Sequence, residues 1–288
     1  MTRKVVLTAD DFGLDPALTD VIIGLLAQER ISATTVITPS PHAAPALAAL
    51  AAARDAGRLP DGFAPGVHVT MSSDEGLPAF HPLAPDTSSL LDPTTGALPL
   101  DPDTREPLLD PEEVVRELTA QVDRVARAGW HPSRIDLHRG VLYGLAGRSF
   151  LPELLQVCAQ RDLGLRMPRM LVGPMGGTVP PDLLPLHHRA VVEADRLGVP
   201  LPQVMATNPV PATQIGSYEE LRDFYLHLLD ELPPDGVSEI YLHPAPDDPD
   251  LLRRFPTWRK RVWEARLLGD PAFRDGLAAQ DVELVPRW

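Results

Sequence analysis

The sequence predicts an α/β fold with a parallel β-sheet, and polar side chains gather at one edge of that sheet. Short apolar or β-branched runs alternate with helical segments, as in folds whose parallel strands are joined by helices. Several of these runs end in Asp, His or Arg, and the active sites of parallel barrels lie at the carboxyl ends of the strands. The chain has 288 residues, of which 44% are hydrophobic and 23% are charged. This length suits one barrel-sized domain, with two smaller domains as the alternative.

The first predicted strand, residues 5–7, leads into the adjacent carboxylates Asp10 and Asp11. Two carboxylates at the end of a buried strand repel each other unless a cation, hydrogen bonds or a split in their pKa values relieves them. Because successive side chains of an extended strand point opposite ways, we expect one Asp to bind a metal while the other faces different groups. The alternative is that one of them only caps the following helix, a role also expected of Asp15.

The remaining elements follow from periodicity and from Pro and Gly punctuation. Helices have apolar residues spaced three and four apart, and strands are short and rich in β-branched residues. Helices are predicted over residues 17–30, 43–56, 111–128, 150–163, 187–197, 219–232, 258–268 and 271–280. Further strands are predicted over residues 32–38, 66–70, 134–138, 164–167, 237–244 and 282–285.

Two segments do not fit this alternation. Residues 71–110 are rich in Pro, Asp, Ser, Thr and Gly, and they are too long for an ordinary connection. We expect a lid, the wall of a binding site or a disordered loop there. Residues 168–217 are irregular, with a loop-like stretch over residues 173–185.

Composition excludes several classes of protein. The formal net charge of -14 argues against nucleic-acid binding, which needs a basic face. Cys158 is the only cysteine, so an intrachain disulfide is impossible, and its apolar neighbours predict a buried helix position. No run approaches the roughly 20 apolar residues that a membrane span needs. The first apolar run is too short for a signal peptide, so we expect a cytoplasmic protein that does not bind membranes.

A basic patch stands out in this acidic chain. It comprises Arg253, Arg254, Arg266 and the run Arg259-Lys-Arg261. We expect it to form a solvated helix face or a subunit contact, the latter implying a homodimer. The alternative is that it binds an anionic substituent of a substrate.

The strand ends suggest metal-assisted hydrolysis of an amide or ester. Asp10, Asp11, His68, Asp136, His138 and His243 all fall at predicted carboxyl ends of strands. One carboxylate with two imidazoles is a common open site for a catalytic divalent metal, either tetrahedral zinc or a six-coordinate ion. A remaining carboxylate can then act as general base, and a more distant histidine can protonate the leaving group. No Gly-x-Ser-x-Gly elbow or phosphate-binding loop offers a competing mechanism.

The ordered motifs resemble the YdjC-like carbohydrate deacetylases, the family that includes chitooligosaccharide deacetylase. The match runs from Val5 to about Asp270. It comprises Thr8-Ala-Asp-Asp-Phe-Gly-Leu14, Ile31-Ser-Ala-Thr-Thr35, Gly66-Val-His-Val-Thr70, Glu117-Leu-x-x-Gln121, Ile135-Asp-Leu-His138 and Leu242-His-Pro244.

The resemblance implies a deformed, TIM-barrel-like (β/α) barrel that forms a single domain over residues 1–288. It further implies one divalent metal, magnesium or zinc, held by Asp11, His68 and His138. Asp10 would be the general base and His243 the general acid. Asp136 and Arg166 would support the site or the substrate. The substrate would be a small N-acetylated sugar, and the products would be acetate and a sugar with a free amine.

The chain departs from the family pattern at several positions. Thr8 replaces an Asn, Arg134 and Gly140 replace two histidines of the family's His-rich run, and Ala245 replaces a Gly. These departures leave two alternatives open. One is a metal-dependent amidohydrolase or phosphoesterase that acts on a non-sugar substrate. The other is a catalytically weak sugar-binding protein.

Overall fold

The strands are parallel wherever they pair, and the first five lie side by side in chain order. The computed structural model describes residues 2–145, 147–171 and 183–288. Its strands are β1 (Arg3–Phe12), β2 (Ala33–Val36), β3 (Gly66–Val69), β4 (Arg134–Leu137), β5 (Gly164–Leu165), β6 (Met205–Ala206), β7 (Val237–Leu242) and β8 (Val282–Leu284). Their order across the sheet is β5-β4-β3-β2-β1-β7-β6, and β8 pairs with the start of β1. The predicted deformed (β/α) barrel is confirmed.

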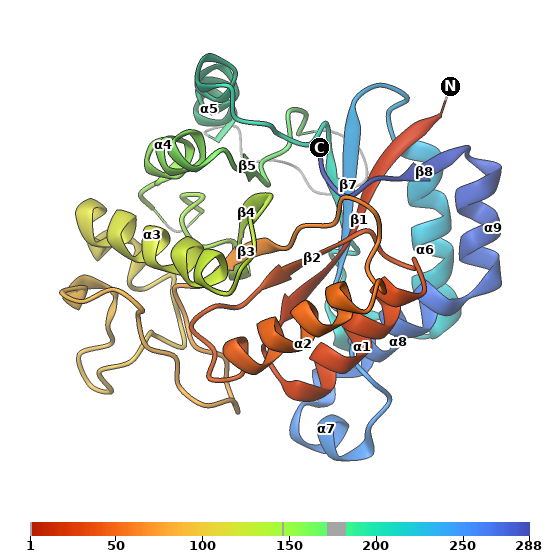
Figure 1. Ribbon diagram of the computed structural model, residues 1–288, viewed down its shortest axis with the longest axis horizontal. Coiled ribbons are helices and arrows are strands. Elements are labelled where there is room, and N and C mark those ends of the chain that lie inside the picture. Colours follow the sequence, from red (N-terminus) through yellow and green to blue (C-terminus); the bar gives the residue numbers. More distant parts are fainter. Residues whose placement is uncertain (1, 146, 172–182) are drawn as a thin grey trace.

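Helices surround these strands (Figure 1). They are α1 (Pro16–Ala27), α2 (Ala43–Asp55), α3 (Pro111–Arg127), α4 (Leu151–Arg161), α5 (Leu183–Leu197), α6 (Tyr218–Glu231), α7 (Pro249–Arg254), α8 (Arg259–Gly269) and α9 (Pro271–Ala279). The periodicity did not predict β6 or α7, which are two and six residues long. Such short elements contain too few residues to show a repeating pattern.

The barrel is deformed between β5 and β6, which are the two ends of the strand order. There the backbone N–H of Leu165 donates to the carbonyl of Pro200, and that of Arg169 donates to the carbonyl of Pro202. Irregular backbone therefore joins these two strands. Part of the predicted loop at residues 173–185 lies outside the described residues, but α5 begins at Leu183, so the loop prediction was wrong for residues 183–185.

Side-chain caps define where several helices begin. Asp15 accepts a hydrogen bond from the N–H of Ala17 at the start of α1, and Asp110 caps α3 in the same way. A Pro follows each cap, at a position whose N–H has no partner within the helix. Asp15 therefore caps α1, and the alternative that Asp10 or Asp11 does so is wrong.

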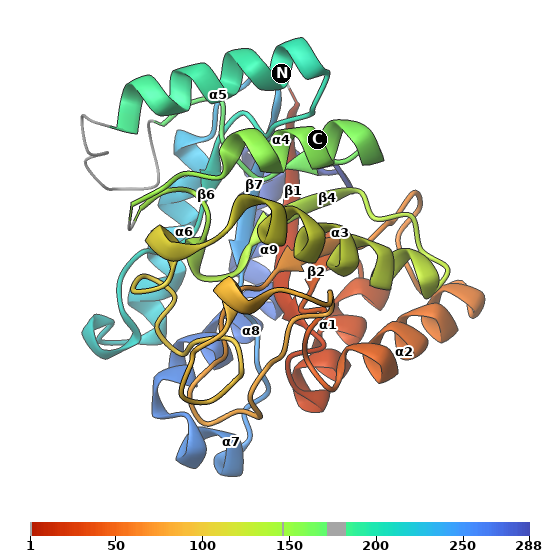
Figure 2. The same cartoon turned by 90° about the vertical axis from the view of Figure 1, so that its left-hand side faces the viewer.

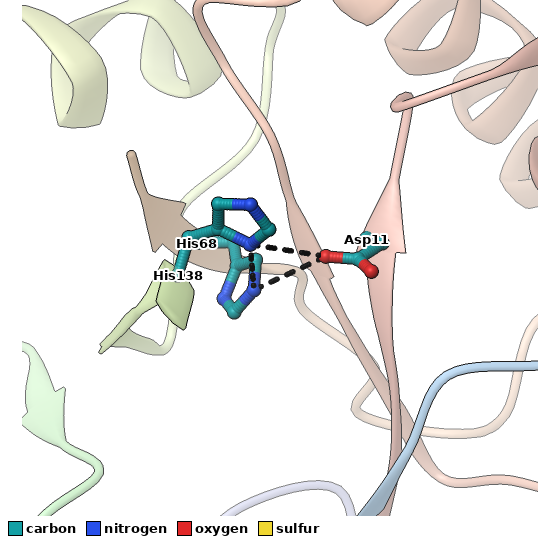
Figure 3. Close-up of side chains that lie close together, drawn as sticks. All are labelled: Asp11, His68 and His138. Atoms are coloured by element: carbon teal, nitrogen blue, oxygen red, sulfur yellow. Dashed lines mark hydrogen bonds and ion pairs between the residues drawn. The ribbon is translucent and has the colours of Figure 1, made fainter. Parts of the chain in front are cut away.

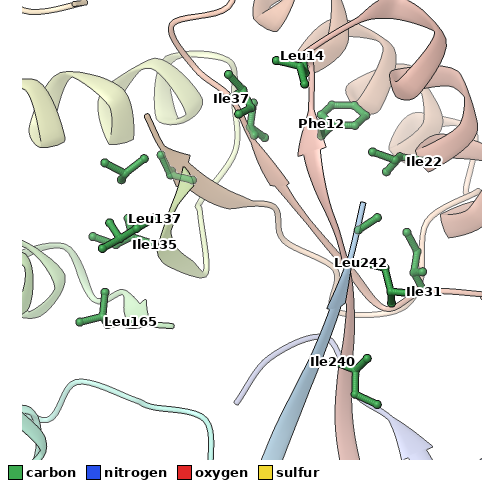
Figure 4. Packing of buried hydrophobic residues seen from close by; sticks show 14 of the residues in the cluster. Phe12, Leu14, Ile22, Ile31, Ile37, Ile135, Leu137, Leu165, Ile240 and Leu242 are labelled. Carbon is green, nitrogen blue, oxygen red and sulfur yellow. The ribbon is translucent and has the colours of Figure 1, made fainter. Parts of the chain in front are cut away.

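The core is formed by the strands and by the inner faces of the helices (Figure 4). The last eight residues of β1 are buried, and so is every residue of β2, β3 and β4. β1 contains a continuous apolar run, as is usual for a strand buried on both faces, whereas β2, β3 and β4 mix β-branched or apolar residues with polar ones. Polar residues on such strands lie within the same buried layer and need partners there.

The long segment of residues 71–110 packs on the barrel around buried Phe80 and Leu98. Ser73 Oγ accepts from the N–H of Phe80 and donates to the carbonyl of Leu98. Figures 1 and 2 place this segment and α7 at the end of the barrel toward which β1 runs. Gly76 contacts Phe255, because a Cβ at this glycine would lie only 2.8 Å from Phe255 Cε1. The segment therefore covers the edge at which the polar side chains gather.

Two glycines test how tightly the barrel is packed. A Cβ at Gly66 would lie 2.8 Å from Thr35 Cγ2 and 3.1 Å from Arg134 Cγ. We expect Gly66→Ala to lower the free energy of unfolding by about 1–3 kcal/mol through overpacking. Gly24 lies within α1 and has open space around it, so Gly24→Ala should raise that free energy by about 0.5–1 kcal/mol. Urea unfolding of both variants measures the contrast, and a neutral Gly66→Ala would contradict the tight packing.

Candidate metal and catalytic site

Asp11, His68 and His138 meet at the carboxyl ends of β1, β3 and β4 (Figure 3). Asp11 lies on β1, His68 on β3, and His138 directly follows β4. Asp11 Oδ1 is 3.3 Å from His68 Nε2 and 3.3 Å from His138 Nδ1, and the two nitrogens are 3.2 Å apart. All three side chains are buried. The fold thus brings together the three residues that the sequence predicted as ligands.

The chemistry of these atoms fits a divalent metal. Two ligand atoms of a tetrahedral zinc ion lie about 3.3 Å apart when each bond is about 2.0–2.1 Å long. The three separations match this spacing. Asp11 Oδ1 is buried and has no hydrogen-bond partner, which is costly for a carboxylate oxygen unless a cation binds it. In the absence of a metal, this geometry requires protons on the imidazoles.

Protons compete with a metal for these ring nitrogens, and the pKa values of both histidines are raised. Burial alone would lower the pKa of His68, but the carboxylates of Asp136 and Asp10 raise it to about 10. Burial opposes the protonation of His138 as well, yet Asp11 and Asp74 raise its pKa. The ring of His68 is therefore protonated near neutral pH when no metal is bound, and the shift of His138 favours its protonated form as well. A metal that binds these nitrogens displaces the protons.

In each candidate ligand, the second ring nitrogen or second carboxylate oxygen contacts another side chain. His68 Nδ1 contacts Asp136 Oδ2 at 2.5 Å, and His138 Nε2 contacts Asp74 Oδ2 at 3.0 Å. A histidine that donates its other ring proton to a carboxylate is fixed in the tautomer that a metal requires. On the carboxylate ligand, Asp11 Oδ2 accepts from Arg261 Nη1 at 2.6 Å.

Asp74 and Arg261 were not predicted as site residues. Asp74 lies in the loop of residues 71–110, where nothing in the sequence distinguishes it from the other acidic residues. Arg261 belongs to the basic patch, which we expected to form a solvated face or a subunit contact. That expectation was wrong for Arg261, because its guanidinium group pairs with Asp11 beside the candidate ligands.

A bulge in β1 orients the two adjacent carboxylates. The pairing of β1 with β2 shifts register between Ala9 and Phe12, and Asp11 has a φ of 65°. A backbone in this left-handed region turns the side chain away from the alternation of a regular strand. Both Asp10 and Asp11 therefore have an oxygen within 4.8 Å of a His68 nitrogen. Asp10 and Asp11 do face different groups, as expected, since Arg166 holds Asp10 while Asp11 faces His138 and Arg261. The expected cause, a regular extended strand, was wrong, because the bulge orients them and β1 continues beyond them to Phe12.

Arg166, which follows β5, holds the other carboxylates of the site. Its guanidinium group donates two hydrogen bonds to Asp10, two to Glu239 and one to Asp136, at 2.5–2.9 Å. Thr35 Oγ1 also donates to Asp10. Burial would raise the pKa of Asp10, but the nearby Arg166 charge outweighs it and holds this pKa well below its usual range. Asp10 is therefore an ionised, precisely oriented carboxylate.

Asp10, His68 and Asp136 form a second group with metal-ligand spacing. Both oxygens of Asp10 and Oδ2 of Asp136 already accept hydrogen bonds from Arg166. The guanidinium group thus supplies the positive charge that a metal would bring to these carboxylates. The group of Asp11, His68 and His138 is the better candidate metal site, because Asp11 Oδ1 accepts no hydrogen bond.

Glu239 on β7 is a further buried residue that the sequence did not reveal. Thr8 Oγ1 donates to Glu239 Oε1 at 2.6 Å, and Arg134 Nη2 donates to Thr8 Oγ1 at 3.1 Å. Arg134 Nη2 also lies 3.7 Å from Glu239 Oε1. Thr8 and Arg134 are two of the departures from the family pattern, and they contact each other and the same glutamate. Glu239 is hidden in the sequence because β7 reads as an ordinary strand.

His243 follows β7 on the more open side of the site. Its Nε2 lies 3.8 Å from Asp10 Oδ2, and its side chain is 31% exposed. Partial burial is the main cause that lowers the pKa of His243 below its usual value, so the ring is neutral near neutral pH. Its backbone N–H donates to buried Glu264 Oε2. The two side chains predicted to be catalytic, Asp10 and His243, therefore lie next to each other.

A cleft lies beside this group of residues. It has a volume of about 460 Å³ and is lined by Asp74, Leu77, Arg254, Trp258 and Arg261, among others. A smaller cavity of about 220 Å³ is lined by His243, Trp258 and Arg261. Trp258 and Arg261 border both spaces. The larger space is thus lined by Asp74 and Arg261, which contact His138 and Asp11, and the smaller one by His243.

Within the described residues, no helix is long and apolar enough to cross a membrane. Cys158 is buried, as predicted, and burial raises the pKa of its thiol. A buried, protonated thiol is a poor nucleophile.

The fold and the site together define a (β/α) barrel protein with a buried Asp-His-His cluster of metal-ligand geometry at the carboxyl ends of its strands. Residues 4–279 match the model of the YdjC-like protein family, and the chain belongs to this family.

Two relatives show how far the similarity extends. The chain is 30% identical over 140 residues to a carbohydrate deacetylase of Enterococcus faecalis (strain ATCC 700802 / V583), a match that covers 48% of this chain and 49% of that protein. The chain thus spans about half the length of this curated relative. A solved structure, a candidate cellobiose-phosphate cleavage protein from Enterococcus faecalis V583, superimposes with a TM-score of 0.74 at 24% identity. That match covers 99% of this chain and 97% of the other, and it supports the fold.

Glu239 offers a test of the buried ion-pair network. Removing its charge leaves Arg166 with fewer partners, and breaking a buried pair costs about 3–5 kcal/mol. We expect Glu239→Gln to lower the free energy of unfolding by this amount. Asp195→Asn is the control, because its pair with Arg169 is exposed and such pairs contribute about 0–1 kcal/mol. Urea unfolding compares the two, and similar losses in both variants would contradict a special role of the buried network.

Proposed function

We propose that the protein is a metal-dependent carbohydrate deacetylase, which hydrolyses the acetamide group of an N-acetylated mono- or oligosaccharide. The observation that carries the proposal is the placement of Asp10 and His243 beside the metal-fitting group of Asp11, His68 and His138. Membership of the YdjC-like family supports it, as does the similarity to a relative named carbohydrate deacetylase. The products are acetate and a sugar amine.

We propose Asp11 Oδ1, His68 Nε2 and His138 Nδ1 as the ligand atoms. Two imidazole nitrogens favour zinc over magnesium, since magnesium prefers oxygen ligands. The spacing of about 3.3 Å expected for tetrahedral zinc favours it too. A divalent ion bound there supplies Lewis acidity, which polarises the amide carbonyl and lowers the pKa of water.

The side chains divide the proton transfers between them. Asp10 is ionised, and Arg166 fixes its orientation, so it can take a proton from the attacking water. The same contacts make Asp10 a weak base that does not retain the proton. His243 is neutral and lies 3.8 Å away, so it can receive this proton and donate it to the departing amine nitrogen. The C–N bond then breaks, and the sugar leaves as a free amine.

An assay of acetate release tests the proposal. The purified protein is incubated with diacetylchitobiose and other N-acetylated sugars, in the presence of zinc or magnesium. We expect Asp10→Asn to reduce kcat by about 10²–10⁴-fold, the usual contribution of general acid-base catalysis, and to retain the metal. Asp11→Asn should lose the metal as well as the activity.

Asp20→Asn is the matched control, because Asp20 is exposed on α1, and it should match the wild type. The proposal is overturned if the wild type releases no more acetate than Asp10→Asn across the whole panel of sugars.

A further inference from the structure

We infer that Arg261 is a positioning residue that restricts Asp11 to one metal-binding oxygen, and that it thereby sets which divalent ions the site prefers. The inference rests on the metal site proposed above. It concerns a residue that the proposed mechanism does not use and that enters the site from α8, 250 positions after Asp11.

The two oxygens of Asp11 have different surroundings. Oδ2 accepts a hydrogen bond of 2.6 Å from Arg261 Nη1. Oδ1 has no hydrogen-bond partner and faces the nitrogens of His68 and His138, each 3.3 Å away. A carboxylate that binds a metal through both oxygens must turn both toward the ion. Arg261 opposes this, because its hydrogen bond to Oδ2 would have to break.

The position of Arg261 is itself constrained. Its guanidinium group lies over the ring of Trp258, 5.0 Å from the centroid. Trp258 stacks on Phe255 with ring centroids 4.3 Å apart and an interplanar angle of 17°. Phe255 in turn packs against Gly76 of the long loop. The side chain of Arg261 is only 20% exposed, so the arginine is held between this stack and the carboxylate.

Asp11 is constrained from the other side by its backbone. The bulge in β1, with a φ of 65° at Asp11, fixes the direction in which its side chain leaves the strand. The bulge therefore sets the direction of the Asp11 side chain, and the hydrogen bond from Arg261 sets the rotation of its carboxylate. As a result, only Oδ1 is available to bind an ion.

This arrangement distinguishes between ions. One oxygen and two imidazole nitrogens satisfy three positions of a tetrahedral zinc ion and leave a fourth for water or substrate. Larger, oxygen-preferring ions of higher coordination number gain from a carboxylate that binds through both oxygens. By holding Oδ2, Arg261 withholds that additional ligand from them. Its positive charge also lowers the attraction of the site for any cation that depends on charge alone.

Metal titration of the whole protein tests this role without an activity assay. Wild type, Arg261→Gln and Arg259→Gln are stripped of metal with a chelator and titrated with Zn²⁺ and with Mn²⁺. Arg259→Gln is the matched control, because it removes the same charge from an exposed position on α8. We expect the ratio of Zn²⁺ to Mn²⁺ affinity to fall by about tenfold or more in Arg261→Gln, within the range for residues that orient metal ligands. The ratio should not change in Arg259→Gln.

Cobalt(II) gives a second readout of the coordination number, since four-coordinate Co²⁺ absorbs visible light more strongly than six-coordinate Co²⁺. Its bands should weaken in Arg261→Gln and not in Arg259→Gln. If Arg261→Gln does not fold, Arg261→Met carries the same expectation, because its aliphatic chain can still cover Trp258.

Three outcomes would overturn the inference. An unchanged affinity ratio with an unchanged cobalt spectrum would show that Arg261 does not restrict Asp11. An equal loss of both affinities would show a merely structural role. If the wild type bound neither Zn²⁺ nor Mn²⁺, the metal site of the proposed function would itself be wrong.

Discussion

The burial of many carboxylates at one edge of a barrel is the constraint on which the rest of this structure depends. Asp10, Asp11, Asp136 and Glu239 are buried, and Asp74 joins them at the surface of the site. Three guanidinium groups, those of Arg134, Arg166 and Arg261, pair with them. Five carboxylates against three guanidinium groups leave two negative charges. The surrounding carboxylates raise the pKa values of His68 and His138, so protons on these rings can balance the two charges when no metal is present. A divalent cation with neutral imidazoles gives the same balance, so the network is matched in charge to the ion that we propose.

Much of this arrangement could be predicted from the sequence, because it depends on local patterns. The parallel strands appear in the sequence as short apolar or β-branched segments, and polar residues near the carboxyl ends of such segments lie at one edge of the sheet. This reasoning found His68, His138 and Asp136. It did not find Glu239, because a buried glutamate within a strand looks like a solvent-facing one until its partners are known. Asp74 and Arg261 were missed because only the tertiary fold brings a loop and a distant helix to the site. The bulge at Asp11 was also missed, since a shift in strand register depends on the neighbouring strand.

Two of the departures from the family pattern, Thr8 and Arg134, contact each other in the fold. Thr8 and Arg134 lie on β1 and β4, and in the fold they share one hydrogen bond and the same partner, Glu239. Glu239 binds Arg166 through both of its oxygens, and Arg166 in turn binds Asp10. The two substitutions therefore act on the orientation of the proposed base, behind the candidate metal ligands. They do not remove any of the three ligand atoms, which agrees with a metal site that is retained.

The most direct measurement is anomalous diffraction from crystals of the protein grown with zinc, recorded at the zinc absorption edge. We predict one strong anomalous-difference peak within about 2.0–2.2 Å of Asp11 Oδ1, His68 Nε2 and His138 Nδ1. These are the bonding distances of zinc to oxygen and nitrogen. Arg261 should remain on Asp11 Oδ2. A peak between Asp10 and Asp136, or the absence of a peak near His68 at saturating zinc, would contradict it.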